Sequence, residues 1–84
     1  STSISWVLLD DEVFVFDEIT NKIFVFRNLK KDFWLLIDSN VRIKDIIYQL
    51  TKSKNLDANS IEGKIMKYIE EWMKDNLIDW GECV

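Results

Sequence analysis

The sequence contains no histidine and no proline, and its 84 residues include only two glycines and one cysteine. Without histidine, the chain has no histidine-dependent catalytic triad and no zinc site that uses histidine. The two glycines, Gly63 and Gly81, form no glycine-rich phosphate loop. The lone Cys83 can neither close an internal disulfide nor supply a paired-cysteine zinc site. A single thiol suits a reducing compartment, and we expect a cytoplasmic protein.

The composition also argues against several kinds of partner. With 11 basic and 15 acidic residues the net charge is −4, so broad attraction to nucleic acid or to an anionic membrane is not expected. The longest purely apolar run, residues 33–37, is far shorter than the ~18 residues that suggest a membrane span. Residues 1–3 begin no signal-peptide pattern. The length predicts one domain, residues 1–84, either free-standing or cut from a larger enzyme.

The first third of the chain is typical of strands. Residues 4–9, 13–16 and 23–26 are rich in β-branched and aromatic side chains. The acidic triplet at residues 10–12 separates the first two runs, and Asn21 stands where the second turn needs a positive φ. The pattern predicts a three-stranded antiparallel meander.

Both faces of the second and third strands are apolar. In residues 13–16 the valines alternate with phenylalanines, and residues 23–26 repeat the pattern with Ile23 and Val25 opposite Phe24 and Phe26. One face must cover a layer of helices. The other face is covered by terminal segments or a helix edge, or it forms a groove that another molecule fills.

The rest of the chain is typical of three helices. Asn28 is a suitable N-cap for a first helix that includes Phe33. Isoleucines at helical spacing predict a second helix from residue 43 to about Lys52. A polar segment precedes a third helix from about Ser60 to Asn76. The fold class is therefore α+β, with three strands followed by three helices.

The apolar arc of the third helix is wider than one neighbour requires, because it covers about half the circumference. Either two elements pack on it, or one flank is exposed. Tyr68 and Trp72 lie at one edge of the arc, beside Lys64 and Asp75. Because large amphipathic rings at such a boundary often mark an interface, this edge is the better candidate for a binding surface, although Trp72 in the core is the alternative.

No group of residues supports catalysis. The acidic triplet at residues 10–12 is better explained as a solvated hairpin turn than as a metal site, because successive side chains in a turn point apart. Glu70 and Glu71 are neighbours on a helix surface and do not converge in a cleft. We therefore predict no enzyme activity, no catalytic residue, no metal and no cofactor.

The order of elements is also compatible with a winged helix, which makes DNA binding an alternative. The second helix offers Arg42, Lys44, Gln49 and Lys52, which are suitable for contacts with base edges or phosphates. However, Asp45 interrupts them, and the domain is acidic overall.

Several segments resemble one known family. Residues 13–29, VFVFDEITNKIFVFRNL, resemble its pattern of strand, acidic turn, second strand and an Asn-Leu pair that opens a helix. Residues 33–38 and 41–47 resemble its signature of a helix that ends in aspartate, a short turn and a following isoleucine. Residues 69–78 resemble its closing helix. The family is the PqqD-like peptide chaperones, the recognition elements for precursor peptides that are made on ribosomes and then modified. Ser39 and Asn76 stand where the family has glycines.

The resemblance implies a winged-helix-like domain that binds a peptide without catalysis. In this family the leader segment of the precursor adds as a fourth antiparallel strand beside the third strand, and the third helix walls the groove. The peptide-binding residues that this implies here are Ile23, Phe24, Val25, Phe26, Arg27, Ile61, Lys64, Ile65, Tyr68 and Trp72.

The implied partners are the leader peptide and a modifying enzyme or leader protease to which the domain delivers it. Holding the leader raises the effective concentration of the rest of the peptide at that enzyme. Two alternatives remain: a winged-helix DNA-binding regulator, and an oligomer such as a dimer built through the same open sheet edge.

Overall fold

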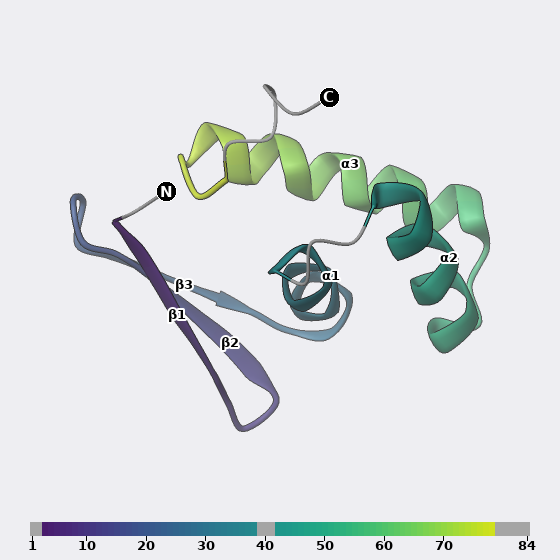
Figure 1. Cartoon of the computed structure of the whole chain (residues 1–84), viewed down its shortest axis with the longest axis horizontal. Coiled ribbons are helices and arrows are strands. Elements are labelled where there is room, and N and C mark those ends of the chain that lie inside the picture. Colours follow the sequence, from purple (N-terminus) through teal and green to yellow (C-terminus); the bar gives the residue numbers. More distant parts are fainter. Residues whose placement is uncertain (1–2, 39–41, 79–84) are drawn as a thin grey trace.

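The computed structural model describes residues 3–38 and 42–78 (Figure 1). Its strands are β1 (Ile4–Leu9), β2 (Glu12–Asp17) and β3 (Lys22–Phe26), and its helices are α1 (Asn28–Asp38), α2 (Ile43–Lys54) and α3 (Ala58–Lys74). The predicted α+β class, with three strands before three helices, is confirmed. Ser39, Gly81 and Cys83 lie outside the described residues.

The strands form an antiparallel sheet in the order β1-β2-β3. The first hairpin has a two-residue loop, in which Asp10 and Asp11 adopt φ values of 52° and 63° between the paired residues Leu9 and Glu12. Two consecutive positive φ angles fit a type I′ turn, whose twist matches that of the flanking strands. Two residues of the acidic triplet, Asp10 and Asp11, therefore form the hairpin turn that the sequence indicated, and the third, Glu12, is the first residue of β2.

The second turn depends on Asp17, the last residue of β2. Its carboxylate accepts hydrogen bonds from the N–H groups of Ile19 at 2.9 Å and Thr20 at 3.4 Å. The Asp17 carbonyl also accepts from the N–H of Asn21 at 2.8 Å. Asn21 has the predicted positive φ, 58°, which asparagine tolerates better than most residues. These contacts satisfy a carboxylate in a residue that is only 5% exposed.

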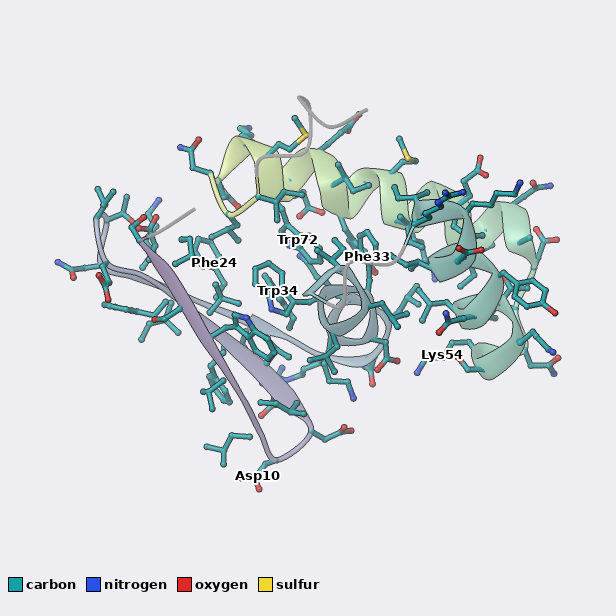
Figure 2. All side chains as sticks on the ribbon, viewed as in Figure 1. Asp10, Phe24, Phe33, Trp34, Lys54 and Trp72 are labelled. Carbon is teal, nitrogen blue, oxygen red and sulfur yellow. The ribbon has the colours of Figure 1, made fainter. Side chains whose placement is uncertain are left out.

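Helix α1 lies at the centre of the fold and contacts the sheet and both other helices (Figure 1). Alternation along β2 turns Val13 and Val15 toward the helices, and both are fully buried. Further in, Phe33 of α1 stacks on Trp72 of α3 with 5.2 Å between ring centroids. Trp34 packs edge-on against the same Trp72 at 5.1 Å (Figure 2). Within the core, an aromatic cluster therefore joins α1, α3 and the sheet.

Helix α3 starts and ends earlier than the sequence predicted. Asp57 is its N-cap, with a carboxylate that accepts from the Ser60 N–H at 3.2 Å. At the other end Asn76 has a φ of 59°, and the Leu77 N–H donates to the Trp72 carbonyl at 2.8 Å. This is the hydrogen-bond pattern of a Schellman motif, so Asn76 occupies the left-handed position that glycine usually takes.

Candidate functional site

The hydrogen-bonding direction of each strand residue follows from one bond at the edge of the ladder. The Glu18 N–H donates to the Ser3 carbonyl at 3.1 Å, so residue 18 directs its backbone groups toward the β1 side. Backbone groups alternate in direction along an antiparallel strand. Residues 12, 14 and 16 therefore also face β1, while Val13, Val15 and Asp17 face β3.

The same alternation identifies the open groups on β3. Val13 pairs with Phe26 and Val15 pairs with Phe24, so both phenylalanines direct their N–H and C=O groups toward β2. Ile23 and Val25 direct theirs the other way, toward the edge of the sheet. β3 is the last strand of the sheet that the described residues form. We call the outward backbone groups of Ile23 and Val25 the β3 edge.

The side chains of β3 divide between two faces. Phe24 is half-buried and Phe26 is 3% exposed on the helix-covered face, and Figure 2 shows Phe24 pointing from β3 toward the α3 side. On the opposite face Ile23 and Val25 are 66% and 41% exposed. Arg27, just beyond the strand, is exposed and donates from Nε to the Glu12 carboxylate. All five residues predicted on this strand therefore lie together at or beside the β3 edge.

The backbone of helix α3 does not approach β3 closely. No Cα atom of β3 lies within 8 Å of a Cα atom of α3. The two elements are linked through side chains, because the rings of Phe26 and Trp72 lie 5.1 Å apart.

The predicted α3 residues do not all reach the surface. Ile61 and Ile65 are fully buried and Trp72 is 1% exposed, so these three belong to the core. The preferred interpretation of Trp72 as an exposed wall residue is wrong. The wide apolar arc has two neighbouring helices, α1 and α2, and rings from α1 cover the edge where Trp72 lies. Lys64, which is exposed, and Tyr68, which is half-buried, remain accessible.

Lys30 also lies at this site, although no pattern in the sequence indicated it. Its Nζ atom lies 5.2 Å from the ring centroid of Phe26 and 5.4 Å from that of Tyr68. It is also 3.6 Å from a carboxylate oxygen of Glu71. A cation over two ring faces gains a favourable electrostatic contact. Lys30 therefore connects the end of β3 with α3. Burial, and to a lesser extent the charge of Glu71, raise the pKa of the neighbouring Tyr68 above its ordinary value.

The outer face of the sheet, opposite the helices, is apolar and largely exposed. Across it Val7 pairs with Phe14, which pairs with Val25, and Ser5, Phe16 and Ile23 form the next row. Val7, Ile23 and Val25 are 54%, 66% and 41% exposed, while the phenylalanines are half-buried. The exposure of these described residues favours the alternative in which another molecule fills this face over the one in which a helix edge covers it.

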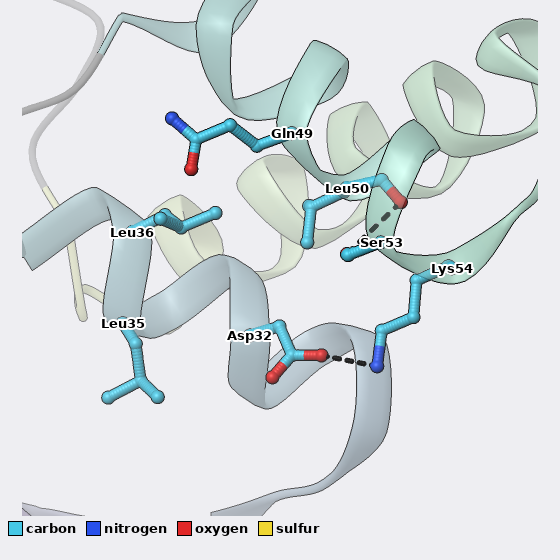
Figure 3. A pocket seen from close by; sticks show the side chains of 7 residues that line it. All are labelled: Asp32, Leu35, Leu36, Gln49, Leu50, Ser53 and Lys54. Atoms are coloured by element: carbon cyan, nitrogen blue, oxygen red, sulfur yellow. Dashed lines mark hydrogen bonds and ion pairs between the residues drawn. The ribbon is translucent and has the colours of Figure 1, made fainter.

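A separate hollow of about 410 Å³ lies between α1 and α2 (Figure 3). Its lining residues are Asp32, Leu35, Leu36, Gln49, Leu50, Ser53 and Lys54. The Lys54 ammonium and the Asp32 carboxylate lie 2.5 Å apart, so its two charged groups already satisfy each other.

Two further findings concern only residues 3–38 and 42–78. They contain no group of three or more acidic or cysteine side chains placed to hold a metal ion. None of their helices combines the length and the apolar character needed to cross a membrane.

Comparison with known proteins gives one informative result. The sequence matches no protein-family model and no curated protein. The fold matches the solved structure of TbiB1 in complex with the TbiA(beta) leader peptide, with a TM-score of 0.89 and 18% sequence identity. The match covers 94% of this chain and 92% of that one. At this identity the comparison shows that the two proteins share a fold.

Proposed function

We propose that this domain binds the leader segment of a ribosomally made precursor peptide by adding it as a fourth strand at the β3 edge. The observation that carries the proposal is the pair of outward-facing residues Ile23 and Val25, whose backbone groups pair with no described element. Strand addition satisfies such groups with main-chain hydrogen bonds, which supply affinity for any extended segment. The added strand runs antiparallel to β3, as neighbouring strands do in this sheet.

Specificity comes from the side chains on both sides of the added strand, because successive residues of a strand point to opposite faces. On the helix side the peptide meets Phe24, Tyr68 and the Lys30 ammonium. On the outer side it extends the apolar rows that end in Ile23 and Val25. We therefore expect a peptide whose paired segment carries apolar side chains on both faces, which distinguishes it from an ordinary amphipathic strand.

The comparison supports this proposal through the bound molecule that it names. TbiB1 was solved with a leader peptide, and this chain shares its fold over nearly the whole length. We infer that the chain belongs with the PqqD-like recognition elements and acts in the cytoplasm without catalysis of its own. Its second partner is a modifying enzyme or leader protease, which benefits from the raised local concentration of the tethered peptide.

No feature of residues 3–38 and 42–78 favours duplex DNA as the ligand. Arg42, Lys44 and Gln49 of the α2 region are exposed, but Asp45 is exposed among them. The net charge of −4 also argues against broad attraction to the phosphate backbone.

Amide hydrogen exchange tests the proposal at single residues. The probe is a synthetic candidate leader peptide that carries apolar side chains on both faces of its paired segment, and labelled duplex DNA is titrated in parallel. The amides of Ile23 and Val25 are expected to exchange fast in the free domain and to become protected when the peptide binds. The amides of Phe24 and Phe26 already bond to β2 and serve as internal controls. Peptide binding without new protection at Ile23 and Val25 would contradict strand addition there.

A further inference from the structure

The sheet has a second open edge, on β1. The Ser3 carbonyl accepts a hydrogen bond from the N–H of Glu18, which directly follows β2. Because backbone groups alternate in direction along a strand, those of Ser5, Val7 and Leu9 also point toward β2. Ile4, Trp6 and Leu8 therefore direct their N–H and C=O groups away from the sheet. Among the described elements β1 has close backbone contacts with β2 alone. We call these outward groups the β1 edge.

Four consecutive apolar side chains accompany this edge. Trp6 and Leu8, on the helix side, are 36% and 48% exposed, and Val7 and Leu9, on the outer side, are 54% and 57% exposed. Between β1 and α1, the Trp6 and Trp34 rings are in contact, with their centroids 6.4 Å apart. The strand is thus open along its edge and partly open on both faces.

The two edges differ in protection against pairing with another chain. Proteins usually guard an open edge with charged residues, proline or a bulge. β3 contains Lys22 and is followed by Arg27. β1 is followed by Asp10 and Asp11, but its own six residues include no charged residue and no proline, and they pair with β2 in continuous register. An unguarded edge of this kind is expected to be covered in the functional protein.

We propose that β1 pairs antiparallel with β1 of a second copy of this chain, around a two-fold axis at Trp6. The pairing follows from the directions of the backbone groups. Trp6 lies opposite Trp6 of the second copy, and Ile4 lies opposite Leu8 of the second copy, so each outward group meets an outward group. Because the contact is the same on both copies, it closes at the dimer.

Charge supports a second copy in this orientation. The acidic hairpin residues Asp10 and Asp11 follow the C-terminal end of β1. Antiparallel pairing places the two acidic hairpins at opposite ends of the contact, whereas parallel pairing would place them side by side and repel. The resulting six-stranded sheet keeps both β3 edges at its outer ends, so the dimer is compatible with peptide binding but does not depend on it.

Sedimentation velocity on the full chain, from micromolar to millimolar concentration, tests the proposal. The parent is expected to reach twice the monomer mass. Val7 and Val25 are matched sites, because both face outward and flank Phe14 in the same row, beside opposite edges. Val7→Lys is expected to abolish the dimer while circular dichroism shows the parent fold, and Val25→Lys is expected to retain it. A parent that stays monomeric, or a dimer lost only with Val25→Lys, overturns the proposal.

Cysteine pairing tests the register without relying on a charge at β1. The proposed axis places Ser5 opposite Val7 of the second copy as a non-hydrogen-bonded pair, with Cα atoms about 4.5 Å apart, which is within disulfide range. In a Cys83→Ser background, Ser5→Cys with Val7→Cys is expected to give a covalent dimer on mild oxidation. The matched control is Ile23→Cys with Val25→Cys, which is expected to stay monomeric. Cross-linking of the control alone, or of neither protein, overturns the proposed pairing.

Discussion

Phe33 and Trp72 stack with their ring planes 16° apart and their centroids 5.2 Å apart, which fixes α3 to α1 at the centre of the core. Trp72 also contacts Phe26, at 5.1 Å. One indole ring therefore holds together the helix and the strand that flank the proposed peptide site. Trp72 is only 1% exposed, so we expect it to position the proposed site from the core rather than to contact the peptide.

Replacing Trp72 with alanine is expected to lower the free energy of unfolding by about 3–5 kcal/mol, as large cavities in a core do. In a domain of this size that is a large part of the total stability. Trp72→Phe is the informative companion variant. Trp72 Nε1 has no hydrogen-bond partner among the described residues, so the smaller ring loses volume but no hydrogen bond. Denaturant unfolding should therefore show a smaller loss for Trp72→Phe.

Peptide affinity measured on Trp72→Phe separates the two roles of this residue. If the ring acts only through the core, the folded variant binds the leader peptide as tightly as the parent does. A large loss of affinity with little loss of stability would show that Trp72 touches the peptide after all.

Asn76 gives a second prediction, because its φ of 59° is unfavourable for most side chains. Asn76→Ala is expected to lower the free energy of unfolding by roughly 1 kcal/mol, whereas Asn76→Gly should leave it unchanged or raise it slightly. Urea unfolding curves measure both changes. Equal effects of the two substitutions would mean that the left-handed conformation does not control this helix end.

The ion pair between Lys31 and Asp11 predicts a dependence of stability on pH. The Lys31 Nζ atom lies 2.5 Å from the Asp11 carboxylate. The hydrogen bond from Lys31, and then its charge, lower the pKa of Asp11 below the ordinary value of 3.8. Because its pKa is lower in the folded state, Asp11 stabilises the folded protein at pH values above its unfolded-state pKa. This contribution disappears as the pH falls through the folded-state pKa. The same pair raises the pKa of Lys31, chiefly through the hydrogen bond to Asp11, so it is also lost at strongly alkaline pH.

Thermal unfolding of Asp11→Asn and of the parent, compared from neutral to acidic pH, measures this contribution. The parent should be more stable near neutrality, and the difference should shrink as the pH falls below about 4. Asparagine accepts the positive φ of this turn position, so the turn itself is preserved. Asp10→Asn, at a turn residue with no ion pair among the described residues, is the control and should show a smaller difference. A pH-independent gap between Asp11→Asn and the parent would contradict the ion-pair explanation.

The sequence was informative wherever a local rule decides the outcome. The meander follows from β-branched and aromatic runs, and the turns follow from Asp10, Asp11 and Asn21, whose side chains tolerate positive φ. The burial of Trp72 could not be predicted in this way, because a helical wheel gives the direction of a side chain and not the element that it meets. Lys30 lies beside two rings only because the end of β3 and α3 converge on it, and no spacing in the sequence records that contact.

The most direct functional prediction concerns the β3 edge, where backbone groups alternate in direction and only one of two neighbouring amides points outward. The structure identifies Val25 as the outward residue and Phe26 as the residue that bonds to β2. Val25→Pro removes an amide that no described strand uses, and proline is tolerated at such edge positions. It should remain folded by circular dichroism but bind the leader peptide roughly 10-fold or more weakly, since a hydrogen bond of ~1 kcal/mol is lost and the ring obstructs the added strand.

Phe26→Pro should instead damage the sheet, because it removes a ladder hydrogen bond. Alanine variants at both positions separate the backbone effect from the loss of the side chain. Val25→Ala keeps the outward N–H and should lose much less affinity than Val25→Pro, while Phe26→Ala keeps its bond to β2 and should lose less stability than Phe26→Pro. If Val25→Pro and Val25→Ala bind the peptide equally well, the outward amide of Val25 takes no part in recognition, and strand addition at β3 is wrong.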